Sequence, residues 1–201
     1  MKRIIIFLSF YLLPLFGNSE LKNGFGEEYY KLNVEQKRQI FFTKMNTMFD
    51  KSFEEIAKER AFVEAFFYDA YKMGIAQALV ESAMGTSRFA REANNLFGEW
   101  TWGEKGLIPD LRYPDKKHKI RIFDSLQDSV DSYVLNLNRH FAYEEFRNER
   151  AKFESEGKEI TGLEAIKTLD SYSERKGYYI NIVTKIIQRY DLERYDTPKS
   201  F

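Results

Sequence analysis

The chain has 201 residues, in which 31 Lys and Arg side chains balance 31 Asp and Glu side chains, so its formal net charge is +0. This balance gives no basic field of the kind that binds nucleic acid, and we expect no nucleic-acid partner. The absence of cysteine excludes disulfides and thiolate metal sites, and the two histidines, His118 and His140, are too few and too isolated for a zinc site. We therefore predict no metal and no cofactor.

The N-terminus has the pattern of a secretory signal peptide. Two basic residues precede an apolar run over residues 4–16, and the small residues Gly17 and Ser19 follow it, two positions apart as signal peptidase requires. The run is short for a bilayer crossing. We expect residues 1–19 to be removed, leaving one domain over residues 20–201 that is periplasmic or secreted and not inserted in the membrane. The alternative is an uncleaved N-terminal anchor.

The next part of the chain shows helical spacing. Asn33, with Gln36 three residues later, predicts the start of a helix. The apolar residues that follow recur at near-helical intervals, at Ile40, Phe41, Met45, Met48 and Phe49. A second helical stretch is predicted over about residues 53–72, and a short apolar helix over residues 74–84. Gly85 can adopt the left-handed conformation that ends this last helix.

The segment over residues 100–123 differs in composition from the helical parts. Two glycines and two prolines interrupt it, and its last five residues alternate between polar and apolar, which predicts a β-hairpin or flap. Ser125, with Asp128 three residues later, predicts the capping box of a further helix, and apolar spacing predicts a last helix over residues 180–190. The expected fold is therefore mainly α, with a small β-hairpin, in a single domain.

One carboxylate does not fit its local pattern. Glu81 lies near the end of the short apolar helix, and the residues one turn away are Gln77, Ala78, Met84 and Gly85, none of which is a cation. A carboxyl group in an apolar pocket has a raised pKa, so it can stay protonated near neutral pH and act as a general acid. The alternative is a solvated glutamate at the rim of its helix, which is the common case for helical glutamates.

Glu81 also belongs to an ordered series of motifs. The run QALVESAMGTSRFA at residues 77–90 is followed by NNLFG at residues 94–98, WTW at residues 100–102 and YSER at residues 172–175. This series resembles the signature of the bacterial β-N-acetylglucosaminidase family of peptidoglycan hydrolases, and most closely its Bax-like branch. The likeness spans about residues 75–192, and several motifs in order are far more specific than one short pattern.

The resemblance implies a lysozyme-like fold and an exported enzyme that cleaves the glycan strands of peptidoglycan. Glu81 would lie on a helix at one wall of a long cleft and protonate the oxygen that links N-acetylglucosamine to the next sugar. Tyr172 matches the family's active-site tyrosine, whose hydroxyl would orient the acetamido group or the attacking water. Its alternative is a core tyrosine with a satisfied hydroxyl.

The resemblance also implies residues that line the substrate groove. They are Asn94, Asn95, Phe97, Trp100 and Trp102. The two amides would donate to sugar or peptide, and the three rings would stack on pyranose faces. Each has a structural alternative, because asparagine also forms turns and a large aromatic residue also fills a core.

The second catalytic group is not identified by the sequence. The flap offers five carboxylates, at Glu99, Glu104, Asp110, Asp115 and Asp124. Asp124 is interpreted as structural because it adjoins the helix cap, and none of the other four matches a motif firmly. Attack by the substrate's own acetamido group, or by a sugar hydroxyl as in lytic transglycosylases, needs no second carboxylate. Hydrolysis, transglycosylation and a non-catalytic peptidoglycan scaffold therefore stay open. Whichever applies, we expect the flap to cover the groove beside Glu81.

Overall fold

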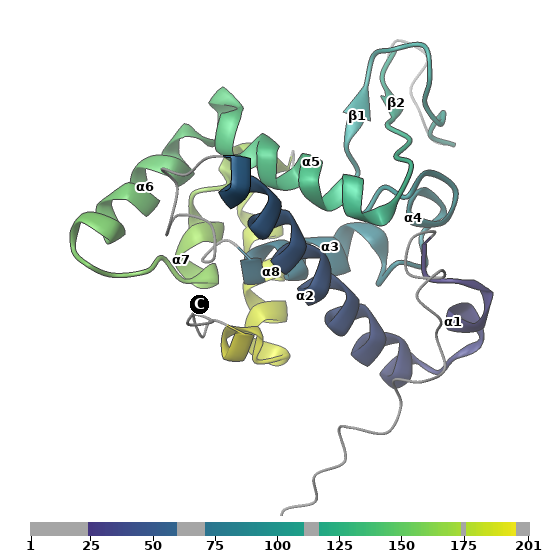
Figure 1. Ribbon diagram of the computed structural model, residues 1–201, viewed down its shortest axis with the longest axis horizontal. Helices are drawn as coiled ribbons and strands as arrows, with labels where there is room; N and C mark the ends of the chain where they lie inside the picture. Colours follow the sequence, from purple (N-terminus) through teal and green to yellow (C-terminus); the bar gives the residue numbers. More distant parts are fainter. Residues whose placement is uncertain (1–23, 60–70, 111–116, 174–175, 196–201) are drawn as a thin grey trace, which may run out of the picture.

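The computed structural model describes residues 24–59, 71–110, 117–173 and 176–195. These ranges are mostly helical and include one two-stranded sheet, which confirms the predicted fold class (Figure 1). The predicted signal peptide lies outside them. None of the described helices is long and apolar enough to cross a membrane.

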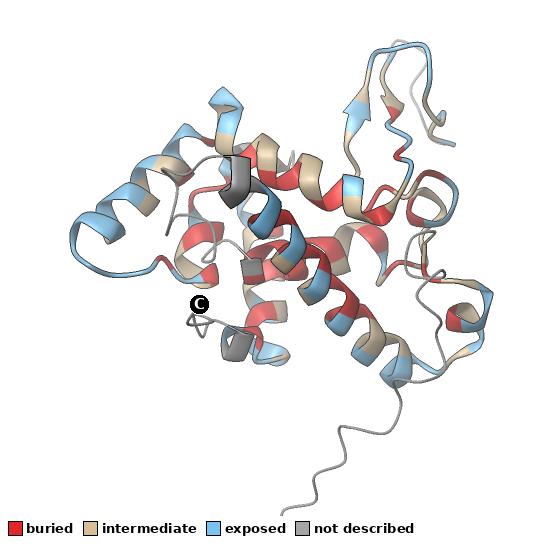
Figure 2. Cartoon of the chain, in the orientation of Figure 1, coloured by how far each residue is buried: buried red, intermediate tan, exposed pale blue. Residues whose placement is uncertain are grey.

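The central helix of the fold is the one that carries Glu81. The helices are α1 (Glu27–Lys31), α2 (Val34–Glu59), α3 (Tyr71–Ser82), α4 (Arg88–Ala93), α5 (Leu126–Arg139), α6 (Glu144–Ser155), α7 (Gly162–Lys167) and α8 (Lys176–Arg189). Three 3-10 turns follow later helices, at η1 (Phe141–Tyr143), η2 (Asp170–Tyr172) and η3 (Leu192–Tyr195). Helix α3 contacts α2, α7 and α8, and α2 in turn packs on α5. Buried residues accordingly gather on α3 and on the inner faces of α2 and α5 (Figure 2).

Helix α2 is continuous, so the predicted division into two helical stretches near Phe53 is wrong. Its predicted start is confirmed, because the Asn33 N–H donates to Gln36 Oε1 at 3.2 Å and the Gln36 N–H donates to Asn33 Oδ1 at 3.0 Å. The helix contains no glycine or proline that could interrupt it. Phe49 and Phe53, one turn apart, stack with ring centroids 6.2 Å apart, which favours continuation through the segment between them.

Helix α3 ends in three consecutive left-handed residues. Ala83, Met84 and Gly85 have φ angles of 49°, 60° and 73°, so the expectation for Gly85 is confirmed while the helix itself stops at Ser82. The left-handed conformation costs roughly 1–2 kcal/mol at each non-glycine residue. Two hydrogen bonds offset this cost: the Gly85 N–H donates to Ser82 Oγ at 2.8 Å, and the Tyr29 hydroxyl donates to the Met84 carbonyl at 2.5 Å.

The segment before α1 is tied to α2 by a buried lysine. Lys44 Nζ donates to the Gly24 carbonyl, lies 4.8 Å from the centroid of the Phe25 ring, and belongs to a residue that is only 7% exposed. Burial of the ammonium group lowers the pKa of Lys44 from its usual 10.5 to about 8.

We expect the free energy of unfolding to rise with pH above the pKa of folded Lys44, near pH 8. Above that pH the folded protein loses this proton while the unfolded chain still holds it, so the unfolded state binds more protons and stability increases. Between pH 7 and pH 9.5 the gain should be about 2 kcal/mol. Urea denaturation at both pH values measures it, and Lys44→Met should show no such gain. Equal pH dependence in the two proteins would contradict the lowered pKa.

Candidate active site

Glu81 lies on the last turn of α3, half-buried and close to the backbone of the NNLFG segment. Gly98 lies close to the carboxyl group, since a Cβ atom placed on it would be 3.7 Å from Glu81 Oε2, and its φ of 67° is in the left-handed region that favours glycine. No Lys or Arg in the described ranges forms an ion pair with Glu81. Burial raises the pKa of Glu81 above its usual value, and a hydrogen bond with the Tyr179 hydroxyl acts in the opposite direction. The carboxyl group is therefore half-buried, with a raised pKa and no described cation paired to it.

An aromatic cluster lies beside this carboxyl group, with Tyr172 in its middle. The Tyr172 ring stacks on Tyr179 at 5.5 Å between centroids, is tilted against Tyr143 at 6.2 Å and meets Tyr133 edge-on at 6.4 Å. Its hydroxyl makes no hydrogen bond to any other described residue. Burial first, and then neighbouring tyrosines and the charge of Glu81, raise the pKa of Tyr172 well above its usual value. Tyr172 is therefore a neutral hydroxyl close to Glu81.

A groove with a volume of about 730 Å³ runs along the base of the hairpin. It is lined by Glu99, Trp100, Trp102, Arg121, Ser132, Leu135, Asn136, Arg139, His140 and Tyr143. Trp100 and Trp102 are 46% and 72% exposed, and their rings meet edge-on at 6.3 Å. Neither Glu81 nor Tyr172 lines this groove, but two of its lining residues adjoin their surroundings: Glu99 follows Gly98 in the chain, and the Tyr143 ring contacts the Tyr172 ring.

The other three predicted groove residues lie elsewhere. Asn94 ends α4 in the left-handed conformation with φ 49°, and its amide donates to the Phe123 carbonyl at 3.1 Å. Asn95 is 1% exposed, and its amide nitrogen donates to the carbonyls of Glu99 and Arg121 at 2.9 and 2.8 Å. Phe97 is buried and stacks on Tyr133 at 4.0 Å. In this structure the two asparagine side chains bond to backbone carbonyls and the Phe97 ring packs in the core, as their structural alternatives describe.

The predicted hairpin is present and projects from the helical body (Figure 1). Strand β1 (Trp100–Thr101) pairs antiparallel with β2 (Lys119–Ile120). The strand predicted over residues 119–123 is shorter because the Phe123 N–H donates to the Ala93 carbonyl at 2.9 Å instead of continuing the ladder. Residues 111–116 lie outside the described ranges, so the covering of Glu81 by the flap stays a prediction.

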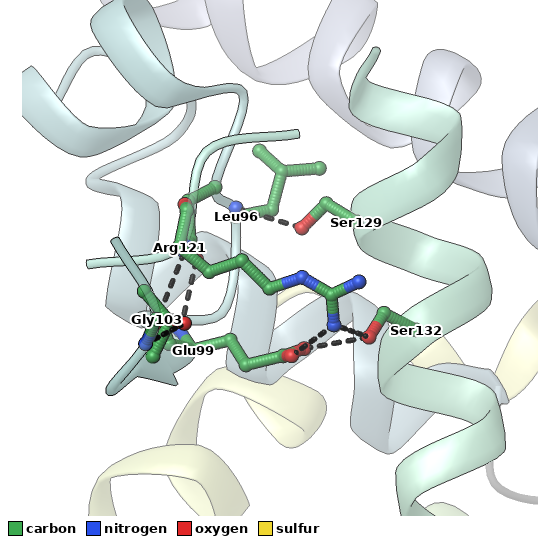
Figure 3. A network of polar contacts seen from close by, with 8 residues as sticks. Leu96, Glu99, Gly103, Arg121, Ser129 and Ser132 are labelled. Atoms are coloured by element: carbon green, nitrogen blue, oxygen red, sulfur yellow. Dashed lines mark hydrogen bonds and ion pairs between the residues drawn. The ribbon is translucent and has the colours of Figure 1, made fainter. Parts of the chain in front are cut away.

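Among the flap carboxylates that the structure describes, Glu99 alone lines the groove, and both of its oxygens are engaged. Arg121 Nη1 lies 2.6 Å from Glu99 Oε1, the Ser132 hydroxyl donates to Glu99 Oε2 at 2.8 Å, and Arg121 Nη1 also donates to Ser132 Oγ at 3.0 Å. Figure 3 shows this network joining the base of the hairpin to α5. Its geometry ties the groove wall to the helical body.

The remaining flap carboxylates have other surroundings. Asp110 pairs with Arg88 at 2.8 Å, Glu104 is exposed, and Asp115 lies outside the described residues. Asp124 precedes the capping box of α5, which is formed as predicted by Ser125 and Asp128.

The sequence does not single out Tyr179, although its hydroxyl lowers the pKa of the Glu81 carboxyl group. A signal was available, since Tyr179, Val183 and Ile187 share one face of α8 at intervals of four residues, and all three are buried. A tyrosine on a buried helical face needs a partner for its hydroxyl. The identity of that partner, on a helix about a hundred residues earlier in the chain, could not be read from the spacing.

Three comparisons bear on this site. Residues 67–192 match the glucosaminidase family, described as mannosyl-glycoprotein endo-beta-N-acetylglucosaminidase. Protein bax of Escherichia coli (strain K12) is 38% identical over 111 residues, which cover 55% of this chain and 39% of that protein. Exo-glucosaminidase LytG of Bacillus subtilis (strain 168) is 25% identical over 173 residues, which cover 73% of this chain and 56% of that protein.

The fold also has a solved relative. The catalytic domain of the autolysin Auto from Listeria monocytogenes superposes with a TM-score of 0.52 at 18% identity, covering 82% of this chain and 98% of that domain. At this identity the likeness concerns the fold alone. The chain spans between about two fifths and just over half of the length of the two curated relatives.

Proposed function

The chain belongs to the glucosaminidase family, and from this premise we propose that it cleaves the glycan strands of peptidoglycan, as an endo-β-N-acetylglucosaminidase with Glu81 as general acid. The observation that carries the proposal is the setting of Glu81, which is half-buried, has a raised pKa and lies beside the neutral hydroxyl of Tyr172. A protonated carboxyl group in this position can donate its proton to the glycosidic oxygen as the bond to the leaving sugar breaks.

The nucleophile of the reaction is assigned to the substrate. Both oxygens of Glu99 are held by Arg121 and Ser132, so this carboxylate is better suited to anchoring the hairpin than to activating water. As Glu81 protonates the glycosidic oxygen, the acetamido oxygen of N-acetylglucosamine can attack its own anomeric carbon and displace the leaving sugar, and water then opens the resulting ring. The Tyr172 hydroxyl is placed to orient that acetamido group.

The groove is proposed as the path of the glycan strand. The exposed rings of Trp100 and Trp102 offer flat apolar surfaces to sugar faces, and Asn136 and Arg139 offer hydrogen-bond donors along the same groove. The signal-peptide pattern of residues 1–19 supports export to the compartment in which this polymer lies.

Trp102→Ala is expected to weaken substrate binding without slowing the chemical step. Losing one aromatic contact should raise KM for soluble glycan fragments roughly twofold to tenfold. The value of kcat should stay nearly constant, because the contact is the same in ground state and transition state. The matched control is Phe141→Ala, which removes a ring that is 80% exposed but does not line the groove. Equal effects of the two substitutions would remove the groove from the substrate path.

Mass spectrometry of digested peptidoglycan tests the proposed reaction. Reducing N-acetylglucosamine ends are the expected product. Reducing N-acetylmuramic acid ends would instead identify a muramidase, and anhydro-muramic acid ends a lytic transglycosylase. An intact polymer, left by a folded protein that still binds it, would identify a scaffold.

A further inference from the structure

We propose that Gln77 fixes the direction of a buried hydrogen-bond chain, from Tyr133 through Gln77 to Tyr179, that presents the Tyr179 hydroxyl to Glu81 as a permanent donor. Gln77 and Tyr133 are then positioning residues, since they act on the carboxyl group only through Tyr179. The inference rests on the proposed role of Glu81 and names the residues that prepare it for proton transfer.

The chain joins three helices inside the core. The Tyr133 hydroxyl on α5 donates to Gln77 Oε1 on α3 at 2.5 Å, and Gln77 Nε2 donates to Tyr179 Oη on α8 at 3.2 Å. The Tyr179 hydroxyl lies beside Glu81, where its interaction with the carboxyl group lowers the pKa of Glu81. Gln77 is 0% exposed, Tyr133 4% and Tyr179 6%, so these groups have only one another as partners and not bulk water.

The direction of the chain follows from its donors and acceptors. A side-chain amide has one accepting end and one donating end, and a tyrosine hydroxyl has a single proton. The two distances suit an O–H···O bond at the Tyr133 end and a longer N–H···O bond at the Tyr179 end. Because Tyr179 Oη accepts from the amide, its own proton is available to Glu81. A reversed amide would draw that proton toward Gln77 and leave the carboxylate without this donor.

The surroundings of Glu81 give this donor an unusual influence. Among the described residues, Tyr179 from α8 and Tyr172 from η2 interact with the carboxyl group, and Gly98 lies close to it. No charged side chain of the described residues pairs with it. The Tyr179 hydroxyl therefore stabilises the ionised form against the effect of burial, and it holds the carboxyl group in one orientation.

The test is an NMR titration of the Glu81 side-chain carbon in the full chain, with the resonance assigned by its loss in Glu81→Gln. Tyr179→Phe should raise the midpoint by about one pH unit or more, because a hydrogen bond to a charged group is lost. Replacing Gln77 should raise the midpoint by a smaller amount, because the Tyr179 hydroxyl then loses the donor that polarises it. Gln77→Met is combined with Tyr133→Phe, so that no buried hydroxyl is left without a partner. The matched control is Tyr143→Phe, which removes a nearby hydroxyl outside the chain and should leave the midpoint unchanged.

The decisive comparison is the Gln77→Met/Tyr133→Phe pair in two backgrounds. The proposed hydrogen-bond chain predicts that this pair shifts the Glu81 midpoint when Tyr179 is present. It predicts no shift in the Tyr179→Phe background, since Gln77 acts only through that hydroxyl. The same shift in both backgrounds, or no shift in Tyr179→Phe alone, would overturn the proposal. The titration reports proton binding and not turnover. Retained cleavage by Glu81→Gln would therefore reject the proposed function, whereas the titration would still test the hydrogen-bond chain.

Discussion

Glu81→Gln is expected to abolish peptidoglycan cleavage while leaving the fold intact. The amide has the shape of the carboxyl group but cannot give up a proton to the glycosidic oxygen, and losing a general acid typically costs about a hundredfold to ten-thousandfold in rate. The folded protein should be at least as stable as the wild type at neutral pH. Ionisation of a buried carboxyl group with a raised pKa lowers the free energy of unfolding, and the glutamine amide cannot ionise.

The measurement is the release of soluble fragments from purified peptidoglycan, with the melting temperature recorded for each protein. Glu99→Gln is the matched control, since it makes the same chemical change in a carboxylate that already has an Arg121 and a Ser132 partner. We expect it to lose less than about tenfold in rate, well short of the loss of a general acid. Activity of Glu81→Gln within a few-fold of wild type would remove Glu81 from the mechanism. Equal losses in both variants would identify Glu99 as a second catalytic carboxylate.

The pH dependence of the wild-type enzyme follows from the same group. A general acid works only while protonated, so the rate falls as pH rises through the pKa of Glu81. Burial moves this decline to a higher pH than is usual for a glutamate, and the interaction with the Tyr179 hydroxyl limits the increase in pKa. The decline should be absent from any residual activity of Glu81→Gln.

The features that could be predicted from the sequence are those set by short-range rules. The caps at Asn33 and Ser125 depend on residues three positions apart, and both form as expected. The left-handed Gly85 likewise follows from the local need to end a helix. The continuity of α2 does not follow from the apolar spacing, which places Phe49 and Phe53 in separate helical stretches. In the structure the two rings stack one turn apart within a single helix.

The site was harder to predict because its parts meet across long separations. Asn95 has an amide of the kind that binds ligands, but both ends of this amide are hydrogen-bonded to the backbone of Glu99 and Arg121. Gln77 lies one turn before Glu81 in the sequence and reads as an ordinary helical glutamine. Only its contacts with Tyr133 and Tyr179, 56 and 102 residues away, give it a polar partner at each end.

Tyr172→Phe is expected to lose most activity, by about tenfold to a hundredfold, with little change in stability. The substitution keeps the ring that stacks on Tyr179 and deletes a hydroxyl that bonds to no other described residue, so the folded state loses no described hydrogen bond. The cost falls on the transition state if this hydroxyl orients the acetamido group, and positioned donors of this kind are worth about a hundredfold or more elsewhere. Steady-state rates on soluble glycan fragments, together with urea denaturation, separate the two effects.

Tyr29→Phe is the matched comparison, because its hydroxyl donates to the Met84 carbonyl at 2.5 Å and serves the end of α3 rather than the substrate. It should lower the free energy of unfolding by about 1 kcal/mol, while the folded fraction stays active. If Tyr172→Phe shows this second pattern instead, with lost stability and retained turnover, the hydroxyl belongs to the core. The acetamido group would then have to be oriented by another donor, for which the hydroxyl of Tyr143 is a candidate because this residue lines the groove and its ring contacts Tyr172.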